Sequence, residues 1–294
     1  MKKRSQEYFI QQALEIDQIP ADEANSIGYA PKILSCVALP MRKQDNNEFI
    51  ARNGHYKISI LSPSDIGLPY GTYLRLLIIW LVTKSKITKS REIYCGKSFS
   101  NLAKELGKHS SGGQQGSITA LREQFKRLFS STIHWIKDGE GEWSIDSMKI
   151  ASNASILWDP VNSSQWESFI TLDDLFFEEI QTSAIPIDMR VIDVCSHYPL
   201  AIDIYCWLTS RYFRLYNPVL IPWRDLWCQF GSSCKRKNHF KSSFMKAATR
   251  VKFFYSKAKF KFTDNGMLLF PSSPHVRPIA KKKKKYRVDN LVDN

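Results

Sequence analysis

Residues 228–253 read CQFGSSCKRKNHFKSSFMKAATRVKF, and this stretch decides the fold. Its second half carries apolar residues at helical spacing, namely Phe240, Phe244, Ala247 or Ala248, and Val251. Side chains three and four residues apart share one face of an α-helix, so these residues form a single buried stripe. Gly231 and the following SSCKRK have the composition of a turn. The stretch therefore predicts a turn that leads into a helix over residues 238–251.

The sequence around this stretch predicts the same order of elements twice. From Tyr198 it predicts an apolar helix (YPLAIDIYCWLTSRYFRL), a short helix (WRDLWCQFG), the turn, the helix 238–251 and a hairpin around DNG at 264–266. From Leu68 it predicts an apolar helix (LPYGTYLRLLIIWLVTKSK), a short helix (FSNLAKELG), a turn, a third helix (SITALREQFKRLF) and a hairpin around DGEGE. This is the order of a winged helix, a helix-turn-helix unit followed by a β-hairpin wing. We therefore expect an α+β fold with two tandem winged-helix domains.

These elements divide the chain into five predicted parts. They are an N-terminal arm (1–50), a first winged-helix domain (51–160), an acidic connector (161–197), a second winged-helix DNA-binding domain (198–279) and a basic C-terminal tail (280–294). We expect the arm to be loosely ordered apart from a short strand near Ile33–Leu39. ILWDP and WESFITL predict strands, and TLDDLFFEEI predicts a short helix capped by Thr171.

Charge is distributed unevenly along the 294 residues, which have a formal net charge of +14. Residues 201–294 hold 20 basic and 5 acidic side chains, a net of +15, which leaves 22 basic and 23 acidic side chains in residues 1–200. Such an imbalance is typical of a protein with a polyanionic partner. The longest apolar run is LRLLIIWLV, too short to span a bilayer, so nucleic acid is a better candidate than a membrane. Six scattered cysteines favour free thiols in a reducing cytoplasm, and the N-terminus lacks the apolar core of a signal peptide.

The second predicted unit carries the strongest candidates for DNA contact. The faces of its third helix away from the apolar stripe hold Lys237, Lys241, Ser242, Lys246, Thr249 and Arg250. The hairpin adds Lys257, Lys259 and Lys261, whose spacing of two places them on one face of a strand, opposite Phe260 and Phe262. Cationic groups neutralise phosphates, and hydroxyls can reach phosphates or base edges. The alternative is a solvated amphipathic helix beside a charged edge strand.

The first predicted unit offers a second basic surface. Residues 75–137 hold 12 basic and 3 acidic side chains. In the third helix, Arg122 and Lys126 lie one turn apart and Arg127 follows. We predict DNA contact here too, although these residues could equally face solvent or a dimer partner. The acidic residues of 138–197 would repel DNA, so that block is expected to pack on the domains or face a protein partner.

Other chemistries find little support in the sequence. Cys228, Cys234 and His239 have a spacing unlike that of zinc sites, and Cys228 fits an apolar position of its helix. GKS at residues 96–98 lacks the upstream glycine of a phosphate loop, because Arg91 stands there. No two histidines lie within twenty residues of each other, so the metal pair of a DNA-nicking enzyme is missing. We expect no catalytic residues, no metal and no cofactor.

The chain resembles the plasmid replication initiators of RepA type. The resemblance rests on LPYGTYLRLLIIWLVTKSKITKSREIYCGKSFSNLAKELG, SGGQQGSITALREQFKRLF, PLAIDIYCWLTSRYF, IPWRDLWCQFG and LLFPSSPHV, which occur in this order between Leu68 and Val276. The N-terminal arm and the lysine-rich tail lie outside it.

The resemblance implies a non-enzymatic protein that binds repeated sequences (iterons) in the double-stranded DNA of a plasmid origin. It implies help in opening the duplex, recruitment of the host initiator and the replicative helicase, and a homodimer that represses or pairs origins. A winged-helix transcriptional repressor, and less readily an origin nickase, remain alternatives from the residues themselves.

Overall fold

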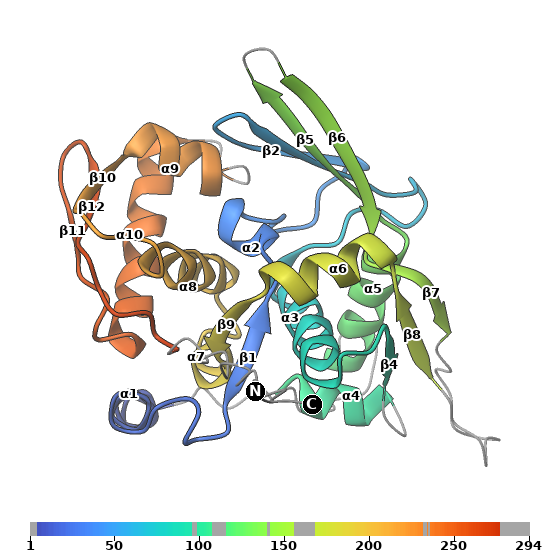
Figure 1. The fold of residues 1–294 in the computed structure, drawn as a ribbon, viewed down its shortest axis with the longest axis horizontal. Helices are drawn as coiled ribbons and strands as arrows, with labels where there is room; N and C mark the ends of the chain where they lie inside the picture. Colours follow the sequence, from blue (N-terminus) through green and yellow to red (C-terminus); the bar gives the residue numbers. More distant parts are fainter. Residues whose placement is uncertain are drawn as a thin grey trace, which may run out of the picture.

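A computed structural model describes residues 5–95, 99–107, 116–139, 142–155, 168–231, 234 and 236–276 (Figure 1). The predicted basic tail, the ILWDP strand and the turn before the third helix of the first unit lie outside these residues. The fold mixes helices and sheets, as expected for the α+β class. In the part of the chain that the structure describes, no helix is long and apolar enough to cross a membrane.

The helices include each one predicted from the sequence, and also helices over residues 6–18, 33–36 and 189–194 that were not predicted. They are α1 (Gln6–Gln18), α2 (Ile33–Cys36), α3 (Gly71–Thr88), α4 (Phe99–Glu105), α5 (Ser117–Phe129), α6 (Asp174–Ser183), α7 (Met189–Val194), α8 (Pro199–Tyr212), α9 (Trp223–Phe230) and α10 (Lys237–Phe254). The strands are β1 (Ile27–Ala30), β2 (Glu48–Asn53), β3 (Tyr56–Leu61), β4 (Glu92–Tyr94), β5 (Thr132–Gly139), β6 (Glu142–Lys149), β7 (Ala151–Ser155), β8 (Phe169–Leu172), β9 (Ile185–Asp188), β10 (Val219–Pro222), β11 (Phe260–Phe262) and β12 (Gly266–Leu269).

Helices α3 and α8 form the centre of the molecule, where the first helices of the two predicted units lie side by side (Figure 1). Both are apolar on nearly all faces, which is typical of helices enclosed by other elements. A fully buried ion pair joins them, in which the Arg75 guanidinium donates to both carboxylate oxygens of Asp203, at 2.7 and 2.6 Å. The remaining Arg75 hydrogens go to the carbonyl oxygens of Leu39, Pro40 and Gly71. Burial raises the pKa of Asp203 to about 6, against the opposing effect of Arg75.

The second unit has the sheet order β10-β12-β11, with both pairs antiparallel. The hairpin β11–β12 turns at the predicted DNG sequence. A Cβ on Gly266 would collide with the Ile221 carbonyl, so glycine is needed where β12 begins beside β10. The Trp223 indole donates to the Thr263 carbonyl at 3.1 Å and holds the hairpin against the start of α9.

The first unit has the same order of helices and hairpin along the chain as the second unit, but its strands pair differently. Its hairpin β5–β6 extends a sheet of order β2-β3-β5-β6, whereas β4 joins a separate sheet of order β4-β8-β7. In the second unit the corresponding strand, β10, pairs with the hairpin itself. The two units are therefore alike in sequence order and unlike in strand pairing.

The N-terminal segment is more ordered than the sequence suggested. A loosely ordered segment with a strand near Ile33–Leu39 was expected, but the structure has helix α2 there, and Leu34 and Val37 are completely buried. Strand β1 pairs with β9, and α1 packs on α7 and α10. The expectation was wrong because a short apolar run does not distinguish a strand from a buried helical turn. The predicted domain boundaries themselves remain a prediction.

The acidic region also differs in detail from its prediction. Helix α6 is present, but Asp173 rather than Thr171 caps it, with its carboxylate accepting from the Leu175 amide at 3.1 Å. WESFITL contributes β8 at its C-terminal end. Phe176 and Ile180 are buried, so α6 packs on the body of the protein.

The buried hydroxyl of Tyr205 on α8 contacts His275, near the end of the described residues. The Tyr205 hydroxyl accepts from the Asp188 amide at 2.8 Å and lies 2.8 Å from Nδ1 of His275. The His275 ring stacks on Tyr255, with 4.4 Å between ring centroids. Burial lowers the pKa of His275 to about 4, so the imidazole is neutral at pH 7.

Candidate nucleic-acid interface

Helix α10 is the candidate recognition helix, and the structure confirms its predicted buried stripe. The buried side chains are Phe240, Phe244, Ala247, Ala248, Val251 and Phe254. Aromatic rings of α9 hold this stripe: Trp227 contacts Phe240 with 5.3 Å between centroids, and Phe230 contacts Phe244 at 5.4 Å. Because the stripe fixes the rotation of α10, it also fixes which side chains face away from the protein.

The predicted contact residues of α10 fall into two groups. Lys237, Ser242, Lys246 and Thr249 are exposed. Lys241 and Arg250 are half-buried, and each lies against an aromatic ring. The Lys241 ammonium lies 4.9 Å from the Trp223 ring centroid, and the Arg250 guanidinium carbon lies 3.4 Å from that of Tyr198. A cation over an aromatic face is attracted by the ring quadrupole, so the two rings give these side chains preferred directions.

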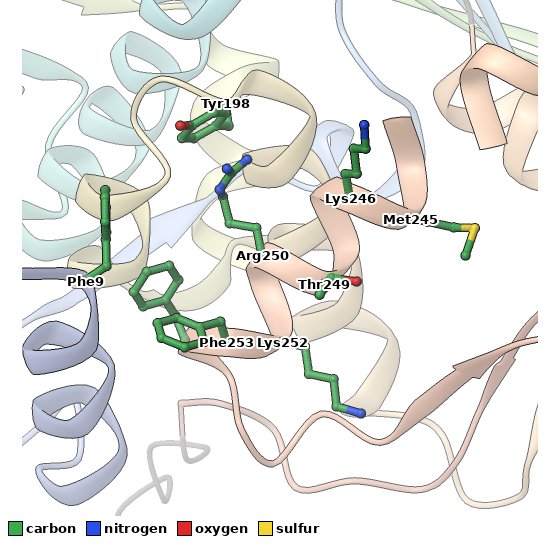
Figure 2. A pocket seen from close by; sticks show the side chains of 9 residues that line it. Phe9, Tyr198, Met245, Lys246, Thr249, Arg250, Lys252 and Phe253 are labelled. Carbon is green, nitrogen blue, oxygen red and sulfur yellow. The ribbon is translucent and has the colours of Figure 1, made fainter. Parts of the chain in front are cut away.

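A hollow of about 840 Å³ lies against the C-terminal half of α10 (Figure 2). Figure 2 shows Arg250 pointing toward Tyr198 while Met245 and Lys246 extend away from it. Phe9 of α1 lines the same hollow. No local sequence signal predicts this neighbour, because the contact joins residues far apart in the chain and follows only from the packing of α1 on α10.

The hairpin lysines are placed differently from the prediction. Only Lys261 lies in a strand, since β11 begins at Phe260, so the expectation of three lysines on one strand is wrong for Lys257 and Lys259. All three are nevertheless exposed, while Ala258 and Phe260 between them are buried, so the alternation itself is present. Lys257 and Lys259 line a second hollow of about 740 Å³.

On α5 of the first unit, the three predicted basic residues have different environments. Lys126 is exposed, whereas Arg122 is half-buried. Arg127 turns toward the loop before α3, where it donates to the Leu68 carbonyl at 3.2 Å and packs over Gly67, whose φ is +78°. Arg127 therefore supports that loop, and DNA contact by all three residues remains a prediction.

The cysteines give no support for a metal site. Among the described residues, no group of three or more His, Cys, Asp and Glu side chains is placed to hold a metal ion. Cys228 is exposed, so its expected apolar, buried position was wrong. Cys234 is half-buried. The GKS sequence at 96–98 lies outside the described residues.

This chain matches one family profile and has structural neighbours among solved proteins. A family profile described as plasmid-encoded RepA protein matches residues 68–219, just over half of the chain. A crystal structure of domains 2 and 3 of RctB superposes with a TM-score of 0.51 at 12% identity, covering 83% of this chain and 97% of that one. A second RctB structure of the same domains gives a TM-score of 0.49 at 13% identity, with 80% and 93% coverage. A search of curated proteins finds no match. The structural likeness concerns the fold alone.

Proposed function

Because this chain belongs to the plasmid-encoded RepA protein family, we propose that it is a replication initiator that binds double-stranded DNA at a plasmid origin. The proposed sites are repeated sequences, or iterons. After binding, the protein promotes opening of the duplex and recruits the host initiator and replicative helicase. It performs no chemistry on the DNA.

The arrangement of helices and strands in the second unit supports DNA binding by a winged helix. Its order is helix, strand, helix, helix, strand, strand, from α8 to β12, and the hairpin β11–β12 joins β10 in one sheet. In helix-turn-helix proteins the second helix of the motif enters the major groove. Here that helix is α10, preceded by α9.

The exposed face of α10 is the observation that carries the proposal. It presents lysines, hydroxyls and an arginine on the side opposite a well-packed aromatic stripe. The family match ends at Val219, so it does not extend to α10. Contact through α10 is supported by the geometry of that helix and by the excess of basic residues after position 200.

A footprint on the origin of the plasmid that encodes this chain tests the proposal. At moderate salt, we expect protection of a set of similar sequences at regular spacing. Protection of a single operator-like site, with plasmid replication unaffected by deletion of the gene, would indicate a repressor. Protection of no sequence would refute the proposal.

Incubation with supercoiled plasmid and Mg²⁺ tests the absence of chemistry. We expect the plasmid to remain supercoiled. A nicked product that disappears when the metal is chelated would show that the protein is an enzyme, even if the footprint is as expected.

A further inference from the structure

The exposed side of α10 contains a middle row of short or uncharged side chains. Asn238, Ser242, Met245 and Thr249 follow one another at spacings of four, three and four residues. Residues at this spacing lie on one helix face, and this face is opposite the buried stripe. Asn238, Ser242 and Thr249 are exposed, and Met245 is half-buried.

Two cationic side chains flank this row. Lys241 and Arg250 are nine residues apart, which is about two and a half helical turns, so they project from opposite sides of α10. Trp223, the first residue of α9, holds Lys241, and Tyr198, just before α8, holds Arg250. The two rings therefore keep these charges at the edges of the exposed face and away from the middle row. Figure 2 shows this for Arg250, which points toward Tyr198.

The chemistry of the row suits base edges. The side chain of Asn can bind an adenine through two hydrogen bonds, Ser and Thr hydroxyls can donate or accept, and an apolar side chain can contact a thymine methyl group. All four side chains lack charge, so the attraction of phosphates acts on them less than on the flanking cations. Their position in the centre of the face brings them to the floor of a major groove that is about 12 Å wide and accepts one helix.

The chemistry of the flanks suits phosphates. Cations on the two sides of a helix that lies in a groove meet the sugar–phosphate backbones that border it. Such contacts fix the register of the protein on the duplex but carry no sequence information.

We infer that Asn238, Ser242, Met245 and Thr249 determine which base sequence this protein selects, while Lys241 and Arg250 hold the two backbones. Tyr198 and Trp223 are positioning residues that act through these cations. The inference rests on the proposed function, because it assumes that α10 enters the groove of a duplex.

Selection from a library of random duplexes, followed by sequencing, separates the two roles. The parent protein is expected to enrich one motif. Single alanine substitutions of Asn238, Ser242 and Thr249 are expected to relax the motif at one or two base pairs, where discrimination falls by about fivefold or more. Affinity for random duplex and its dependence on salt should stay at the parent values. All three positions are exposed, so the variants should keep the parent melting temperature.

Lys241→Ala and Arg250→Ala are the matched comparison. They are expected to weaken binding to all duplexes alike and to leave the motif unchanged. Each should also make the plot of log K against log salt less steep, by about 1 in the slope. Tyr198→Leu should behave like Arg250→Ala, and Tyr198→Phe should restore parent binding because it keeps the ring. If Tyr198 had only a structural role, we would not expect restored binding in Tyr198→Phe together with an unchanged motif.

The outcomes distinguish this inference from the proposed function. If the parent enriches no motif, sequence-specific duplex binding is wrong, and the inference falls with it. If the parent enriches a motif that all three row variants retain at full strength, the duplex is bound but this row does not read it. A motif altered by Lys241→Ala or Arg250→Ala would reverse the assigned roles.

Discussion

Replacement of Asp203 with asparagine is expected to destabilise the whole protein, because Asp203 is the counter-ion of the fully buried Arg75 guanidinium. Arg75 uses all five of its hydrogens, two of them on the Asp203 carboxylate. Both side chains have no exposed surface. Both Asp203 oxygens accept hydrogen bonds from the guanidinium, which is the geometry of an ionised carboxylate paired with a cation.

The magnitude follows from the burial of this pair. An asparagine keeps one acceptor oxygen but turns an amide donor toward the guanidinium, and the positive charge of Arg75 stays in the core without its counter-ion. Removal of one partner of a buried pair costs about 3–5 kcal/mol. Since folded proteins of ordinary stability unfold at a cost of about 5–15 kcal/mol, the variant loses a large share of its stability.

Urea unfolding at pH 7 measures this loss. Glu178→Gln, an exposed carboxylate on α6, is the matched control and is expected to change the free energy of unfolding by about 0.5 kcal/mol or less. A loss below about 1 kcal/mol for Asp203→Asn, with the slope against urea unchanged, would show that water or another group reaches Arg75 and that the pair does not lock α3 to α8.

Three further outcomes are expected. Replacement of Lys241, Lys246 and Arg250 together by alanine should remove most duplex binding in a gel-shift or anisotropy titration, and nearly unchanged affinity would exclude α10 as the contact element. The parent affinity should fall steeply with salt, with a slope of log K against log salt of about −3 or steeper if these three groups meet phosphates; a flat dependence would contradict a phosphate contact. His275 should make the protein acid-sensitive: its folded pKa of about 4 lies below the ordinary 6.5, so the unfolded chain binds the proton first and stability is lost as pH falls through this window. Between pH 7 and 4.5 this amounts to about 2–3 kcal/mol, and His275→Gln should lose correspondingly less stability over that range in urea titrations.

Helix positions were largely predictable from the sequence, because apolar spacing reports directly on the face that a helix buries. The stripe of α10 and the DNG turn were located by such local signals. The segment that forms α2 was not, because its short apolar run fits a strand and a buried helical turn equally well.

The arrangement of the candidate interface was only partly predictable. The basic and hydroxyl residues of α10 were identified from composition and spacing. The ring of Tyr198 over Arg250 was not, because it joins residues 52 positions apart and depends on how α8 packs on α10. Likewise, nothing local in the sequence shows that Arg127 turns inward to the Leu68 carbonyl.

A structure of this chain bound to a duplex from its plasmid origin tests the central claim most directly. The account predicts that α10 lies in the major groove, with Ser242 and Thr249 toward base edges and Lys241 and Arg250 toward opposite backbones. A complex in which the duplex is held elsewhere and the exposed face of α10 remains in solvent would contradict it.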